Sequence, residues 1–73
     1  MTKAIYSKDH KFIVEQLTKA RQEAGLDQAK VAKLLGKTQS HISKVENGQR
    51  RIDVIALKEF AEIYKKPVIF FIK

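Results

Sequence analysis

Residues 28–49 read QAKVAKLLGKTQSHISKVENGQ. The first half of this stretch predicts a short helix, because Val31, Leu34 and Leu35 recur at the spacing of one helical face. Gly36 follows them, and glycine readily adopts the positive φ that ends a helix and opens a tight turn. We therefore expect this helix to stop at Gly36.

The second half predicts another short helix, with a largely polar surface. Thr38 is a suitable N-cap residue, and the pattern ends before Asn47. Only Ile42 and Val45 are clearly apolar inside it. A short helix with so narrow an apolar seam presents a broad polar face to its surroundings. In a basic protein, that face is the first candidate for recognising a partner.

A longer helical pattern precedes this stretch and ends in a glycine. It begins at about Ser7 or Asp9 and runs to Ala24, and Gly25 occupies the position typical of a helix C-terminus. Its apolar residues recur at helical spacing. They are Ile13, Leu17, Ala20 and Ala24.

Two aspartates predict the starts of further helices. Asp27 is a suitable N-cap for the helix that ends at Gly36, and Asp53 for a helix that runs to about Lys65. The apolar residues of this last helix share one face. They are Leu57, Phe60, Ala61 and Tyr64.

The C-terminal segment is short and apolar. Pro67 opens Val68–Ile72, which fits either a fifth helix with proline in its first turn or a β-strand, and we favour the helix. The sequence thus predicts an all-α, compact bundle of four to five short helices in a single domain, residues 1–73. Its centre is a helix-turn-helix over about residues 28–47.

The charge balance points to a polyanionic partner. The chain of 73 residues has 15 Lys and Arg against 8 Asp and Glu, a net charge of +7. Small basic domains commonly bind DNA, RNA or anionic membranes, although the charge is also explained by solubility alone. The N-terminus is not followed by an apolar signal region, and no apolar run approaches the roughly 20 residues of a membrane span. We therefore expect a cytoplasmic protein.

The central stretch resembles the repressor/Cro-type helix-turn-helix, the xenobiotic-response-element family of bacterial and phage transcriptional regulators. The resemblance covers Leu17 to about Tyr64 and implies a lambda-repressor-like fold. Ala32 is small where the two helices cross, and Gly36 allows the tight turn between them. Ile42 and Val45 complete the shared apolar corner, together with Val31 and Leu35.

In this family the start of the second helix of the motif enters the major groove of DNA. Carried over by position, the resemblance implies that Gln39, Ser40 and Lys44 read base edges. Glutamine pairs with adenine N6 and N7, lysine donates to guanine O6 and N7, and serine is permissive. The alternative is that all three are ordinary solvated residues of a surface helix.

The same resemblance implies a set of contacts to the DNA backbone, which position the protein without carrying sequence information. The candidates are Gln28, Lys37, Thr38, His41, Asn47, Arg50 and Arg51. Lys37 departs from the family, because many relatives have a small or apolar residue after the turn glycine. The alternatives are a capping role for Thr38, a turn role for Asn47, and solvated surface positions for the others.

The resemblance also implies a structural ion pair between Arg21 and Glu46, which would orient the recognition helix. It implies a homodimer on a pseudo-palindromic operator, since one recognition helix reads only a few base pairs. The candidates for the dimer interface are apolar or aromatic residues near the C-terminus. They are Tyr64, Val68, Ile69, Phe70, Phe71 and Ile72, some of which are needed instead for the core.

Other functions are less well supported by the residues. We expect neither an enzyme nor a cofactor, because no nucleophile–base pair or phosphate loop is visible. We expect no metal site, because the chain has two histidines and no cysteine. The main alternative is an antitoxin that uses the same domain, although the chain offers almost no tail for a toxin partner. Polymerase is the other protein partner to consider.

Overall fold

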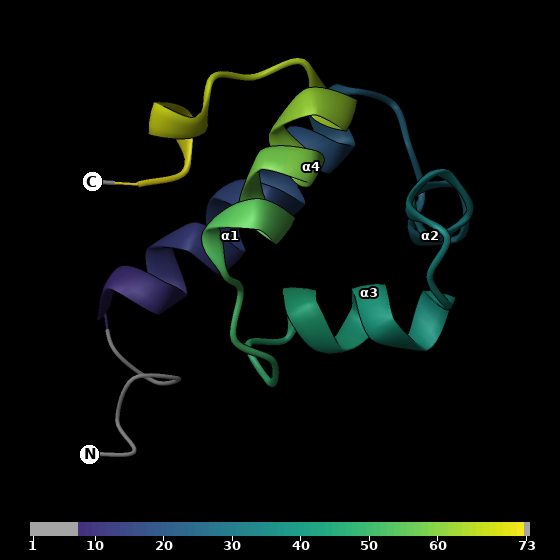
Figure 1. Ribbon diagram of the computed structural model, residues 1–73, viewed down its shortest axis with the longest axis horizontal. Coiled ribbons are helices and arrows are strands. Elements are labelled where there is room, and N and C mark those ends of the chain that lie inside the picture. The colour runs from purple at the N-terminus through teal and green to yellow at the C-terminus, as the bar shows by residue number, and fades with distance from the viewer. Residues whose placement is uncertain (1–7, 73) are drawn as a thin grey trace.

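Four α-helices and one 3-10 helix make up the computed structural model, which describes residues 8–72 (Figure 1). The elements are α1 (Lys8–Glu23), α2 (Gln28–Leu35), α3 (Gln39–Glu46), α4 (Val54–Tyr64) and η2 (Val68–Phe70). No strand occurs within residues 8–72. The predicted all-α fold is therefore confirmed. The earlier of the two predicted starts of α1, Ser7, lies outside the described residues.

Each of the three predicted N-caps is present as a side-chain hydrogen bond to the first turn of its helix. Asp27 accepts from the backbone N–H of residue 30 at 2.8 Å, and Asp53 accepts from that of residue 56 at 2.8 Å. Thr38 Oγ1 accepts from the backbone N–H of His41 at 3.1 Å. Such caps contribute about 1 kcal/mol each and fix where each helix begins.

The turn between α2 and α3 depends on Gly36. Its φ of 69° is left-handed, and its N–H points back to the carbonyls of Ala32 and Lys33. Figure 1 shows α2 nearly end-on while α3 lies in the plane of the view, so the two helices cross at a steep angle. Ala32 is 4% exposed, as expected for a small residue packed inside the motif.

All four α-helices contribute to one hydrophobic core. The largest completely buried side chains are Leu17, Val31, Ile42 and Phe71. The predicted face of α4 is confirmed, because its four apolar residues are at most 6% exposed. Two expectations about which residues are buried were wrong. Leu34 is 53% exposed and Ala24 is also exposed, and Val14 is buried instead in α1.

The C-terminal segment confirms the favoured helix over the strand and corrects the expected dimer interface. After Pro67 it forms the short 3-10 helix η2. Phe71 is completely buried and Tyr64 is 3% exposed, so these two residues belong to the monomer core and offer no surface to a dimer. Ile69 and Ile72 remain exposed, at 73% and 45%.

Candidate nucleic-acid interface

Helix α3 lies at one edge of the molecule, in the lower part of Figure 1. Ile42 and Val45 hold the helix to the core, because both are at most 2% exposed. The three predicted base-reading residues, Gln39, Ser40 and Lys44, are all exposed. The structure therefore presents these side chains together on one accessible helix, anchored by two buried residues.

An ion pair fixes the C-terminal end of α3 to α1. Arg21 Nε donates to Glu46 Oε2 at 2.7 Å, and Arg21 Nη2 donates to Glu46 Oε1 at 3.2 Å. The two side chains are 14% and 6% exposed. Arg21 Nη1 also donates to the carbonyl of Leu26 at 3.0 Å, which ties in the connection from α1 to α2. The hydrogen bond with Glu46 raises the pKa of Arg21 above its ordinary value.

Gln28 joins this ion pair, which sequence reasoning missed. Its side-chain Nε2 donates to Glu46 Oε1 at 3.0 Å, so the carboxylate links α1, α2 and α3. The resemblance had assigned Gln28 to a DNA phosphate, and no sequence pattern indicated this second partner. Tyr64 lies beside the same group, and burial raises the pKa of its hydroxyl. Within residues 8–72 that hydroxyl has no hydrogen-bond partner.

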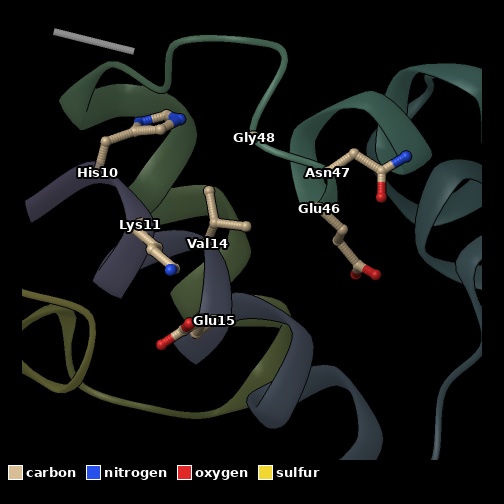
Figure 2. A pocket seen from close by; sticks show the side chains of 7 residues that line it. All are labelled: His10, Lys11, Val14, Glu15, Glu46, Asn47 and Gly48. Atoms are coloured by element: carbon tan, nitrogen blue, oxygen red, sulfur yellow. The ribbon is translucent and has the colours of Figure 1, made fainter. Parts of the chain in front are cut away.

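Asn47 lies at the edge of a hollow between α1 and the end of α3. The hollow has a volume of about 350 Å³, and Figure 2 shows the seven residues that line it. They are His10, Lys11, Val14, Glu15, Glu46, Asn47 and Gly48. The Asn47 side chain points away from α1 in this view and is exposed to solvent. It is therefore accessible to a ligand that approaches α3.

A second hollow brings together most of the predicted DNA-binding residues. It lies at the turn between α2 and α3, has a volume of about 360 Å³, and is called the basic hollow below. Its lining consists of Gly36, Lys37, Thr38, Ser40, His41, Lys44 and Arg50. Of the predicted site residues, Gln28 and Asn47 lie elsewhere, and Gln39 and Arg51 are exposed but outside its lining.

Among residues 8–72, no group of three or more His, Cys, Asp or Glu side chains is placed to hold a metal ion. No helix in that part of the chain is both long and apolar enough to cross a membrane.

An exposed polar helix in a capped helix-turn-helix, next to a basic hollow, defines the class of DNA-binding regulatory domains. A family model described as helix-turn-helix matches residues 17–71. The chain therefore belongs to the Cro/repressor-type helix-turn-helix family, whose members bind DNA and regulate transcription. A search of the curated proteins gave no match.

Proposed function

We propose that this protein is a sequence-specific regulator that binds double-stranded DNA and inserts α3 into the major groove. The observation that carries the proposal is that Gln39, Ser40 and Lys44 are exposed together on α3, while Lys37 and Arg50 line the basic hollow with Ser40 and Lys44. One surface therefore offers side chains that can read bases and cations that can neutralise phosphates. As a DNA-binding protein, it would work in the cytoplasm at the nucleoid.

Base recognition is assigned to three side chains. Gln39 would pair with adenine and Lys44 with guanine, while Ser40 accepts several bases. Lys37, Arg50 and Arg51 would contact phosphates, and the release of counterions makes such binding weaken steeply with added salt. Thr38, His41, Asn47 and Gln28 complete the proposed backbone contacts, with Gln28 needing to share its amide with Glu46.

We also propose a homodimer on a pseudo-palindromic operator, acting as a repressor or autoregulator by occupying the site. Two recognition helices one turn of DNA apart double the number of bases read. Exposed apolar side chains are available for the contact between protomers. They are Ile69 and Ile72 after α4, and Val54 and Ile55 at its start, at 69% and 70% exposure.

The same exposed apolar residues are the observation that favours the alternative, an antitoxin that binds a second protein. Ile55 and Val68 line one hollow of about 550 Å³ along α4. Purification of the chain from its own cells distinguishes the two functions. A stoichiometric small protein that leaves with it supports the antitoxin, whereas a pure homodimer supports the regulator.

Replacing Lys44 with alanine tests the assignment of α3. We expect the variant to lose about 1–3 kcal/mol of discrimination at one base pair of each half-site, because lysine reads guanine there. Competition between single-base variants of the operator, followed by fluorescence anisotropy, measures this loss. Lys19→Ala removes an exposed lysine of α1 and is the matched control. An equal loss of affinity for every operator variant would show that Lys44 contacts a phosphate and not a base.

A further inference from the structure

We propose that the basic hollow holds one phosphate of the DNA backbone and that His41 makes this contact stronger when it is protonated. Affinity for DNA would then rise as the pH falls. The inference rests on the proposed function: it gathers four of the proposed backbone contacts around one phosphate and adds a form of regulation.

The hollow is built by three consecutive segments within residues 36–50. The α2–α3 turn contributes Lys37, helix α3 contributes His41, and the α3–α4 connection contributes Arg50. Ser40 and Lys44 also line the hollow, but the proposed function assigns them to base edges. The three segments converge on one depression of about 360 Å³ because the chain turns before and after α3. A phosphate bound there would be contacted from several sides, as a solvated run of charges on one helix would not allow.

The hollow gathers positive charge without neutralising it. The ion pairs within residues 8–72 are Arg21–Glu46 and Lys66–Glu23. Lys37, Lys44 and Arg50 are therefore not paired with a carboxylate of that part of the chain. Like charges brought together in this way repel one another. An anion that enters between them relieves the repulsion, which points to a phosphate group as the occupant.

Neutral donors in the hollow suit the same ligand. Thr38 uses its oxygen to accept from the backbone N–H of His41, which leaves its hydroxyl proton free to donate. The start of α3 also contributes backbone N–H groups that have no partner within the helix. The ligand would therefore meet both charge and directed hydrogen bonds.

His41 lies between this hollow and a neighbouring one, so its charge depends on both. The neighbouring hollow is also lined by Lys37 and Arg50, and by Arg51, Asp53 and Glu59. Burial lowers the pKa of His41, and Arg50 and Lys37 lower it further. In the free protein the ring therefore takes up its proton at a lower pH than an ordinary histidine does. A phosphate beside it favours the charged ring and raises its pKa.

The direction of the pH effect follows from this difference. Above the pKa of His41 in the complex, affinity is constant, because the ring is neutral with and without DNA. As the pH falls below that value, affinity rises, and it levels off below the lower pKa of the free protein. The total gain is about tenfold for each unit by which DNA raises the pKa of His41.

The test measures affinity for a selected operator duplex between about pH 5 and pH 8 at constant ionic strength, where an ordinary histidine titrates. We expect the wild-type protein to bind more tightly at low pH and His41→Gln to lose that dependence. His10→Gln is the matched control, because His10 lies on α1 at another hollow, and it should keep the wild-type profile. A flat wild-type profile, or an unchanged one in His41→Gln, overturns the inference.

A nuclear magnetic resonance titration of the His41 ring separates this inference from the proposed function. Operator duplex should raise the pKa of the ring, and inorganic phosphate should raise it less. Duplex that binds without moving the pKa overturns the phosphate site and leaves the DNA-binding function standing. If inorganic phosphate raises the pKa but the protein binds no duplex, the proposed DNA-binding function is overturned, and with it the assignment of the hollow to a phosphate of DNA.

Discussion

Replacing Glu46 with alanine is expected to lower the free energy of unfolding by about 2–4 kcal/mol. The change leaves Arg21 with a positive charge at 14% exposure and no carboxylate beside it, and it removes the acceptor of the Gln28 amide. A carboxylate at the C-terminus of a helix is ordinarily unfavourable. Glu46 is stable at the end of α3 because Arg21 and Gln28 surround it.

Chemical denaturation monitored by circular dichroism measures this loss. Glu23→Ala is the matched control, because it breaks the Lys66–Glu23 ion pair at 2.9 Å, which is more exposed to solvent. The control should unfold almost like the wild type, since exposed ion pairs contribute little. Equal behaviour of the two variants would show that the Arg21–Glu46 pair does not hold α3 in place.

The second large effect is expected for Phe71→Ala, which should remove about 3–5 kcal/mol of stability. Phe71 is completely buried, and its ring meets that of Phe70 edge-on with the centroids 5.1 Å apart. A domain of this size has a total stability of only about 4–11 kcal/mol. The variant should therefore melt at a much lower temperature, or be partly unfolded at room temperature, in a calorimetric scan.

Ile69→Ala is the control for Phe71, because it shortens an apolar side chain of the same segment that is 73% exposed. Its monomer stability should change by no more than about 0.5 kcal/mol. A loss as large as that of Phe71→Ala would contradict the packing described for this segment. Sedimentation of Ile69→Ala also reports whether Ile69 supports the proposed homodimer.

The features that the sequence predicted well are local ones. Asp27, Thr38 and Asp53 cap their helices through residues three positions later, and Gly36 ends α2 in the conformation that glycine favours. Such interactions depend only on neighbouring residues. The helix-turn-helix could therefore be predicted from the sequence, and with it the solvent exposure of the polar face of α3.

The features that were missed depend on contacts between distant segments. Gln28 reaches Glu46 across 18 positions, and Phe71, a candidate for the dimer interface, packs into the core instead. Leu34 has the helical spacing of a core residue, but the neighbouring helices cover Val31 and Ala32 instead. Periodicity alone does not specify which part of an apolar face the rest of the fold will cover.

Selection from random duplex DNA with the purified protein, at moderate salt, tests most directly whether α3 reads bases. We predict enrichment of a pseudo-palindrome whose half-sites lie about ten base pairs apart, the spacing that two recognition helices of a dimer require. Enrichment of an isolated half-site would contradict the proposed homodimer but not the assignment of α3 as a recognition helix. Survivors without any shared sequence, bound only weakly and lost with added salt, would contradict the assignment of α3 as a recognition helix.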